Sequence, residues 1–371
     1  MTLRVALLTE VPAPFRFPLF GELAQRRGIR VRVLFLAPRD PRRPYSGDLS
    51  GAGFDCTVLP GRELQRGGRW IVLNRRVLVE LLRLRPHAVI LGGWNQPACW
   101  QALLWARLMR RPVLVWVEST ARDARSGGGA LERAKQLMLR QATAFLVPGT
   151  ASRQYLVGLG VDPVRVHVAP NAVDRTLFRD TVDAHRQRRQ ALRQELGLGE
   201  RTVVLAVCRL DPEKGVDVLL DAVRGLELDL VVAGAGADEA ALRAVAPANA
   251  RFAGVLAPAE LARWYAAADI FALASRSEQW GMVLNEAAEA ALPLVASDAA
   301  GAAADLVVDG ESGIAVPAGQ AEPLRSALAL LAADPPLRAR LGAGARARVT
   351  PLTATAWADA VVAAVEAATR R

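Results

Sequence analysis

Two cations lie close together in the second half of the chain, immediately after an apolar run. Arg209 follows a predicted strand over 202–208, and Lys214 precedes a predicted helix over 216–223. A strand, a short turn and a helix start direct free backbone N–H groups at one point, and two cations beside them suit a diphosphate. A solvent-facing pair, bridged to the neighbouring acids, fits the same local sequence. The local pattern therefore leaves both interpretations open.

Two carboxylates form a second constellation. Glu278 and Glu286 follow a predicted strand over 270–274, with Glu278 in the loop and Glu286 two turns into the next helix. The two side chains could face one ligand from different sides, and carboxylates are good acceptors for paired sugar hydroxyls. The free amides of residues 281–283, at the helix start, can meet an anion. Acidic residues also favour helix starts for structural reasons alone, so here too both interpretations stay open.

The order of apolar and helical patterns along the chain indicates the elements that must position these residues. Short apolar runs alternate with longer helical patterns, which is typical of βαβ units and of a parallel sheet covered on both faces. This alternation occurs once in each half of the chain. Predicted strands lie at 4–9, 31–37, 88–91, 113–117, 145–148, 202–208, 229–233, 270–274 and 294–296. We therefore predict an α/β protein with two doubly wound domains facing a central cleft, and ligands at the carboxyl ends of the strands.

The domain boundaries follow from the same alternation. A length of 371 residues fits two domains of similar size. We predict an N-terminal domain over 1–172 and a C-terminal domain over 173–350, both Rossmann-like in their alternation, with the connection near 170–178. A final helix over 351–371 could cross back to the N-terminal domain.

The composition excludes several classes of protein. Apolar residues make up 52% and charged residues 23%, so the chain can bury a large core. Three cysteines without C-x-x-C spacing and three histidines predict neither a disulfide framework nor a zinc site. Arg4 and Glu10 interrupt the first apolar run, so no secretory signal is predicted, and no stretch is apolar enough to span a bilayer. These features predict a cytoplasmic protein.

The charge is distributed unevenly. Residues 1–178 hold 27 lysines and arginines against 12 acids, whereas the remainder holds 20 against 25. A basic first half suggests an anionic partner, although scattered arginines on a solvated face explain it equally. No nucleic-acid partner is expected, because the arginines are not interleaved with aromatic residues. The densest patch, 69–85, could be a basic helix lying peripherally on the inner face of the cell membrane, or an ordinary packed helix with exposed arginines.

Several stretches, most of them in the second half, share one pattern. They are CRLDPEKGVDVLLDAV at 208–223, VVAGAG at 231–236, FAGVL at 252–256, AADIFALASRSEQWGMVLNEAAEAALPLVASD at 267–298, DLVVDGESGIAVPAG at 305–319 and VHVAPNAVDRTLF at 166–178. In these stretches the chain resembles the retaining glycosyltransferases of family 4, also called group 1, which have the GT-B fold of two Rossmann-like domains. The resemblance covers essentially the whole second half in register, and the E-x7-E spacing of Glu278 and Glu286 is specific in that context.

The resemblance implies that the domain over 1–172 is the acceptor side and that the domain over 173–350 binds the nucleotide sugar. It also implies roles for the residues singled out above. Arg209 and Lys214 would neutralise the diphosphate of a nucleotide sugar, Glu278 would act at the donor sugar as a catalytic residue, and Glu286 would hold the ribose hydroxyls. The backbone near Val255 would contact the base. Amides for the sugar and phosphates would come from Gly281, Met282, Val283 and Leu284. The chain contains no D-x-D motif, so we expect no metal and no cofactor besides the donor substrate.

The first half departs from the family pattern at two loops. The loop 9–18 reads TEVPAPFRFP and lacks glycine; Arg16 could supply charge there, or the loop could be shaped for the acceptor. The predicted strand 113–117 ends in Glu118, where many relatives have a histidine. Glu118 could serve as a catalytic polar or acid–base group, or as a satisfied structural carboxylate. Trp94 is assigned, with Arg16, to the acceptor side.

The resemblance therefore implies a metal-independent, hexosyltransferase-like enzyme of polysaccharide or glycoconjugate biosynthesis. It would move a sugar from a nucleoside-diphosphate sugar to a hydroxyl of a lipid-linked oligosaccharide, a phospholipid or a small-molecule glycoside. Two alternatives stay open. One is a relative that uses a sugar phosphate as acceptor and forms a disaccharide phosphate. The other is a catalytically silent GT-B protein that binds a nucleotide or a membrane without turnover.

Overall fold

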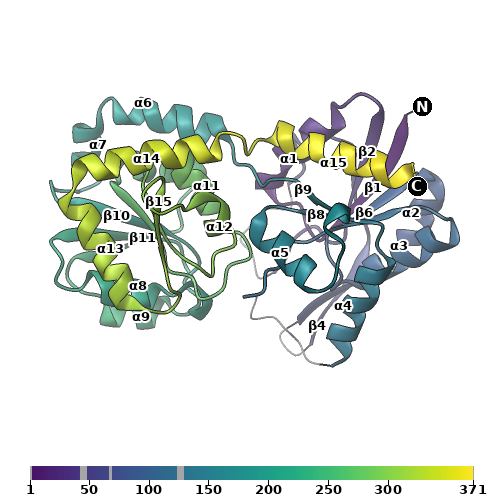
Figure 1. The fold of residues 1–371 in the computed structure, drawn as a ribbon, viewed down its shortest axis with the longest axis horizontal. Helices are drawn as coiled ribbons and strands as arrows, with labels where there is room; N and C mark the ends of the chain where they lie inside the picture. Colours follow the sequence, from purple (N-terminus) through teal and green to yellow (C-terminus); the bar gives the residue numbers. More distant parts are fainter. Residues whose placement is uncertain (1, 42–47, 67–68, 123–128, 371) are drawn as a thin grey trace.

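The chain folds into two lobes that lie side by side (Figure 1). The computed structural model describes residues 2–41, 48–66, 69–122 and 129–370. Each lobe is built on one parallel sheet, because apolar β-branched and leucine runs supply strands that are buried on both faces. The predicted α/β architecture of two doubly wound domains is thus confirmed.

The N-terminal sheet has seven strands in the order β3-β2-β1-β6-β7-β8-β9, and every neighbouring pair is parallel. Its register sets Val5 of β1 opposite Val31 of β2 and Ala88 of β6. The strands are β1 Leu3–Thr9, β2 Ile29–Phe35, β3 Cys56–Val58, β6 Ala88–Leu91, β7 Val113–Trp116, β8 Ala144–Val147 and β9 Val166–Val168.

The C-terminal sheet has six strands in the order β12-β11-β10-β13-β14-β15, again parallel throughout. The strands are β10 Thr202–Val207, β11 Leu228–Ala233, β12 Ala250–Gly254, β13 Ile270–Leu273, β14 Leu294–Ser297 and β15 Gly313–Val316. Strands β12 and β15 lie at the two edges of the sheet, and neither was predicted from the sequence.

Helices cover both faces of each sheet (Figure 1). In the first half they are α1 Phe17–Ala24, α2 Val77–Leu84, α3 Pro97–Leu108, α4 Ala130–Gln141 and α5 Thr150–Gly158. In the second half they are α6 Val182–Arg186, α7 Arg189–Glu195, α8 Val216–Val223, α9 Glu239–Val245, α10 Pro258–Ala267, α11 Met282–Glu289, α12 Ala303–Leu306, α13 Ala321–Ala333, α14 Pro335–Val349 and α15 Ala354–Thr369. None of the described helices is both long and apolar enough to cross a membrane.

The basic segment 69–85 is not one helix, so that prediction was wrong for its first part. Residues Arg69–Asn74 form strand β5, which pairs antiparallel with β4, Gly61–Arg66, and the helix α2 begins only at Val77. Alternation explains the strand, because Trp70 and Val72 are buried while Leu73 is exposed. The helical interpretation failed because a short apolar run fits either element.

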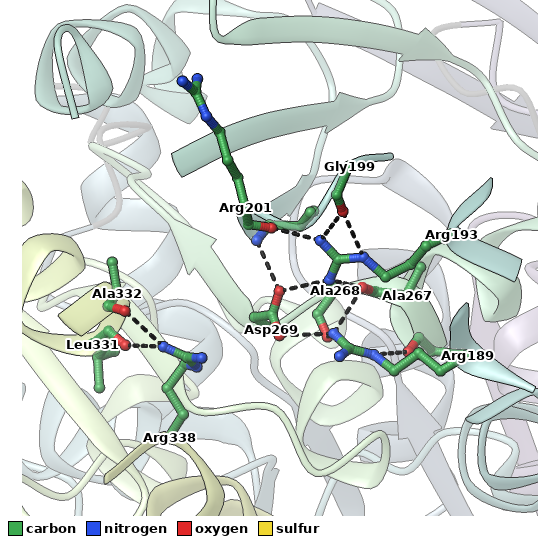
Figure 2. A network of polar contacts seen from close by, with 12 residues as sticks. Arg189, Arg193, Gly199, Arg201, Ala267, Ala268, Asp269, Leu331, Ala332 and Arg338 are labelled. Carbon is green, nitrogen blue, oxygen red and sulfur yellow. Dashed lines mark hydrogen bonds and ion pairs between the residues drawn. The ribbon is translucent and has the colours of Figure 1, made fainter. Parts of the chain in front are cut away.

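The polar stretch after the first domain is helical rather than an open connection. A π-helical turn, Thr176–Thr181, leads into α6 and α7. Arg189 and Arg193 of α7 converge on Asp269, in the turn before β13, at 2.7 and 3.0 Å (Figure 2). Asp269 also accepts the backbone N–H of Val203 at 2.8 Å. This network fixes α7 to β10 and to the start of β13.

The last helix returns to the N-terminal domain. In Figure 1, α14 lies over the second lobe, and the chain then crosses so that α15 lies beside α1. Trp357 of α15 is fully buried and packs edge-on against Phe20 of α1 and close to Trp116 of β7. The core of the first lobe is therefore completed by the last helix of the chain.

Candidate active site at the strand ends

In both sheets the strand order reverses at one point, between β1 and β6 in the first lobe and between β10 and β13 in the second. Ligands in doubly wound sheets bind at such reversal points, outside the carboxyl ends of the strands. Arg209 and Lys214 follow β10, and Glu278 follows β13. The two constellations found in the sequence therefore meet at the reversal point of the second sheet.

Lys214 and Glu278 are in direct contact. Lys214 ends a 3-10 turn, Pro212–Lys214, and is only 8% exposed. Its Nζ lies 2.6 Å from Oε2 of Glu278, and 3.5 Å from a carboxylate oxygen of Glu213. A buried ammonium needs such partners, because desolvation of an unpaired charge is costly. One cation and one carboxylate thus lie side by side at the edge of the sheet where ligands bind.

Arg209 is more open than Lys214. Its guanidinium, 46% exposed, pairs with Asp211 and, at 2.6 Å, with Glu213. In this structure Arg209 therefore has the bridged arrangement that the local sequence left open. These contacts are exposed and weak, so an incoming diphosphate could replace them.

Glu286 lies on α11, whose first turn begins at Gly281. Its Oε2 accepts a 2.8 Å hydrogen bond from the hydroxyl of Tyr265 on α10. Burial raises the pKa of Glu286 to about 7, and the hydrogen bond from Tyr265 opposes this rise. Burial also raises the pKa of the Tyr265 hydroxyl well above its ordinary value, with the Glu286 charge adding to the rise. The sequence carried no signal for Tyr265, because it lies 21 residues from its partner.

The segment opening α11 leaves backbone amides at the site. Gly281 caps the helix with φ 96°, a left-handed conformation that favours glycine. Met282 and Val283 are half-buried and Leu284 is buried, so this first turn is packed while its N–H groups begin the helix. Val255, just beyond β12, is 68% exposed. Among the residues the structure describes, no group of three or more His, Cys, Asp or Glu side chains could hold a metal ion.

The first lobe brings two further predicted residues together. Arg16, after β1, forms a 3.0 Å ion pair with Glu118, after β7, and both side chains are largely buried. The Arg16 guanidinium also stacks on the ring of Trp116, 4.6 Å from its centroid. This stacking fixes the orientation of the arginine, and the arginine in turn holds the Glu118 carboxylate.

Trp94 has a different environment. It is half-buried, its backbone carbonyl accepts the Nε1–H of Trp100 at 2.8 Å, and no described hydrogen bond or ion pair joins it to Arg16 or Glu118. Nearby, Glu10 accepts the side-chain amide of Gln96 at 3.0 Å. Glu10 was not predicted as a site residue, although it lies directly after β1 as Glu118 lies shortly after β7.

Two family models match the chain over most of its length. One, described as glycosyl transferases group 1, covers residues 188–348, and the other, described as a glycosyl transferase 4-like domain, covers residues 19–172. The chain belongs to family 4, group 1, of the glycosyltransferases. The resemblance seen in the sequence is thereby confirmed, and it extends to the first half of this family 4 chain.

Relatives of known description agree with this placement. A D-inositol 3-phosphate glycosyltransferase of Xylanimonas cellulosilytica is 36% identical over 200 residues, which are 51% of this chain and 48% of that protein. An alpha-D-kanosaminyltransferase of Streptomyces kanamyceticus is 28% identical over 340 residues, covering 86% and 85%. The chain thus spans about half the length of the first of these relatives.

Solved structures show the fold of this family 4 chain. The Anabaena protein HepE, in complex with UDP and glucose, superposes with a TM-score of 0.76 at 18% identity over 98% of this chain and 100% of that one. WaaG, a glycosyltransferase involved in lipopolysaccharide biosynthesis, gives a TM-score of 0.69 at 18% identity, over 96% and 99%. The predicted GT-B fold is therefore confirmed.

Proposed function

We propose that this protein is a retaining glycosyltransferase that moves a sugar from a nucleoside-diphosphate sugar to a hydroxyl acceptor. The observation that carries the proposal is the 2.6 Å contact of Lys214 with Glu278 at the reversal point of the second sheet. Glu286 lies in the second turn of the helix that follows, α11. A cation for the diphosphate, a carboxylate for the sugar and another for the ribose then lie along one donor molecule.

In the proposed reaction the acceptor oxygen bonds to the anomeric carbon on the face from which the bond to the diphosphate breaks. The acceptor proton passes to an oxygen of the departing diphosphate, so atoms and charge balance. Lys214, Arg209 and the first-turn amides of α11 stabilise the charge that develops on the leaving group. These groups supply the positive charge locally, which supports transfer without a metal ion or another cofactor.

Glu118 faces the acceptor in this proposal. Its ion pair with Arg16, at 3.0 Å, fixes the orientation of the carboxylate. A carboxylate held at this place can accept the hydrogen bond of the attacking hydroxyl and steer it toward the anomeric carbon. Arg16 and Trp94 then belong to the acceptor side, and Glu278 to the donor side.

A phosphorylated acceptor is the second candidate. The relative from Xylanimonas cellulosilytica is described as a D-inositol 3-phosphate glycosyltransferase. The excess of arginines in residues 1–178 supports the same candidate, because an anionic acceptor would be attracted to that lobe. Transfer to inositol phosphates or sugar phosphates, with none to lipid-linked oligosaccharides, would select this candidate over the first.

We further propose that the first lobe docks on an anionic lipid surface. Helices α2 and α3 pack together and carry exposed apolar side chains among exposed arginines. The apolar ones are Leu78, Val79, Leu82, Leu104, Leu108 and Met109, and the arginines are Arg75, Arg76, Arg83, Arg85, Arg107 and Arg110. Apolar insertion combined with cationic attraction is the chemistry of peripheral membrane binding.

Donor binding tests the central proposal. We expect one nucleoside diphosphate and its sugar to raise the melting temperature of the protein, equally with and without EDTA. Lys214→Ala should lower the transfer rate at least about a hundredfold, because the leaving-group charge is left unpaired. Lys135→Ala is the matched control, since Lys135 is equally buried and ion-paired, with Glu132, on α4. A protein that no nucleotide stabilises would instead be the silent GT-B scaffold.

Vesicle sedimentation tests the membrane contact. The double variant Leu82→Glu, Leu108→Glu should lose at least about tenfold in binding to phosphatidylglycerol-containing vesicles. Leu330→Glu is the control, because Leu330 is also exposed but lies on α13 of the second lobe. Equal binding to vesicles of pure phosphatidylcholine, or equal loss in both variants, would contradict the proposed surface.

A further inference from the structure

The two lobes are in direct contact at the first turn of α5. Gly149, just before α5, is buried, and a Cβ there would come within 2.7 Å of Cζ3 and 2.8 Å of Cη2 of Trp280, and would overlap the Asp305 carboxylate. Its backbone is extended, so space rather than conformation excludes a side chain. The backbone of the first lobe therefore packs directly on side chains of the second.

Asp305 binds this turn through hydrogen bonds. Its carboxylate accepts the Thr150 backbone N–H at 3.0 and 3.2 Å and the Thr150 hydroxyl at 2.6 Å. An acid that takes the free N–H groups at the start of a helix is stabilised by them and by the helix dipole. Here the cap of a helix in one lobe is supplied by α12 of the other lobe.

The same turn reaches Glu118. The Ser152 hydroxyl, on a residue only 1% exposed, donates a 3.1 Å hydrogen bond to the backbone carbonyl of Glu118. Glu118 is the carboxylate that the proposed reaction places at the acceptor. The position of its backbone is therefore tied to the α5 turn.

On the other side the contact reaches Glu278. The backbone N–H of Gly301 binds the carbonyl of Glu278 at 3.0 Å, and that of Ala302 binds the carbonyl of Trp280 at 2.8 Å. Asp305 belongs to the helix that this segment opens. Trp280 is 4% exposed, and its Nε1–H bonds to Asn285 at 2.9 Å. The loop with Glu278 and the helix with Asp305 thus form one packed unit.

We propose that Trp280 and Asp305 are positioning residues. They hold the α5 turn and so set Glu118 of the first lobe against Glu278 of the second. The inference rests on the proposed transfer reaction, because it assigns both carboxylates to the reacting ligands. A misplacement of about 1 Å between them is enough to lower a rate about a hundredfold. In this proposal Trp280 and Asp305 act through Glu118 and Glu278 and not through the reacting ligands.

Asp305→Ala removes the cap and Thr150→Val removes its hydroxyl contact, whereas Asp305→Asn keeps one acceptor oxygen and Thr150→Ser keeps the hydroxyl. Arg122→Ala is the matched control. It removes another bidentate interlobe pair, with Asp298 at 2.6 and 2.7 Å, but an exposed one.

The first measurement is calorimetric affinity for UDP and for GDP. The second is the rate at which UDP-glucose and GDP-mannose are cleaved, with each variant's melting temperature beside it.

The expected result separates turnover from binding. Asp305→Ala and Thr150→Val should lower kcat at least about tenfold and leave the nucleotide Kd within about twofold, with Thr150→Ser near the unchanged protein. Arg122→Ala should change neither quantity measurably. Unchanged kcat in both cap variants, or an equal loss of nucleotide binding, overturns the inference.

The proposed reaction fails separately, when the unchanged protein binds and cleaves none of these nucleotides. Amide hydrogen exchange then decides whether the contact couples the lobes. Loss of protection in Asp305→Ala should spread from α5 to residues 278–281, and loss confined to α5 overturns the inference.

Discussion

At the scale of single residues, the site depends on which charges are buried. Lys135 and Lys214 are the chain's only lysines among 47 lysines and arginines, and each is itself buried and ion-paired. The compact ammonium of Lys214 needs fewer partners than a guanidinium, which suits the narrow space beside Glu278. The exposed Arg209, by contrast, can exchange its protein partners for a ligand without leaving a buried charge unpaired.

Glu286 should make nucleotide affinity dependent on pH. Because its pKa is raised to about 7 by burial, the carboxyl is protonated below this value and accepts ribose hydroxyls poorly. We expect the affinity for the bound nucleotide to increase between about pH 6 and pH 8, and the variant Glu286→Gln to show little of this increase. Calorimetric titration at several pH values measures this change in affinity. Glu239→Gln is the control, because Glu239 forms an ion pair with Arg243 on the surface of α9.

The same group should affect stability with the opposite trend. A folded-state pKa above the ordinary 4.5 gives stability that is present below 4.5 and is lost as the pH rises through about 7. The free energy of unfolding of the unliganded protein should therefore fall over this interval relative to that of Glu286→Gln. Urea unfolding at each pH measures the difference, and a parallel pH dependence of the two proteins would show that burial does not shift this pKa.

At the scale of elements, ion pairs and hydrogen bonds, rather than short connecting loops, hold some helices in place. Glu289 of α11, 1% exposed, binds Arg175 and Arg179 of the interlobe connection at 2.9 and 2.6 Å. Asn285 of the same helix binds the carbonyl of Asn171 at 2.9 Å. The helix that carries Glu286 is thus fixed to the connection between the lobes, so donor-side geometry and interlobe geometry share one element.

The network around Asp269 gives a test at this scale (Figure 2). Burial alone would raise the pKa of Asp269, but Arg189, Arg193 and the Val203 amide lower it overall. Asp269→Asn should reduce the free energy of unfolding by about 3 kcal/mol, because two arginines lose their buried partner. Asp221→Asn, in an exposed pair with Arg224, should change it by less than about 0.5 kcal/mol. Chemical denaturation measures both.

The stability from Asp269 should disappear in acid. Because the folded-state pKa is lowered, this stability is present above the ordinary 3.8 and is lost as the pH falls through the folded value. The difference between the protein and Asp269→Asn should therefore shrink at low pH, and a difference that is constant with pH would mean that packing, not charge, is responsible.

At the scale of the whole molecule, α15 couples the two lobes covalently and by packing. Residues 173–175 and 353–355, which cross between the lobes, line a cavity of about 400 Å³. Trp357, just after the second crossing segment, is buried against Phe20 and Trp116. The last helix therefore ties the second crossing segment to the first core.

Trp357→Ala should destabilise the first lobe selectively. The cavity left by a fully buried tryptophan costs about 3–5 kcal/mol, whereas Trp357→Phe should cost clearly less. Chemical denaturation should show an earlier transition for α1 and the N-terminal sheet, and nucleotide affinity of the second lobe should persist. A single transition, shifted equally in both lobes, would mean that the lobes unfold as one unit.

Much of the architecture could be predicted from the sequence. Long apolar runs such as 202–208 and 88–91 were placed within one or two residues, because a strand buried on both faces leaves a continuous apolar signal. The edge strands β12 and β15 and the β4–β5 hairpin were missed. Strands β12 and β15 are half-exposed and depend on pairing with β11 and β14, whereas the short apolar run of β5 also fitted a helix.

The sequence alone determined the family, the doubly wound fold and the residues at the strand ends, because these depend on local periodicity and on motifs close together in the chain. The tertiary structure alone decided which charges meet. The pairs Lys214 with Glu278, Arg16 with Glu118, Tyr265 with Glu286 and Thr150 with Asp305 join residues 21 to 155 positions apart. Such contacts produce no periodic pattern in the sequence, because the packing of whole elements brings the residues together after local structure is set.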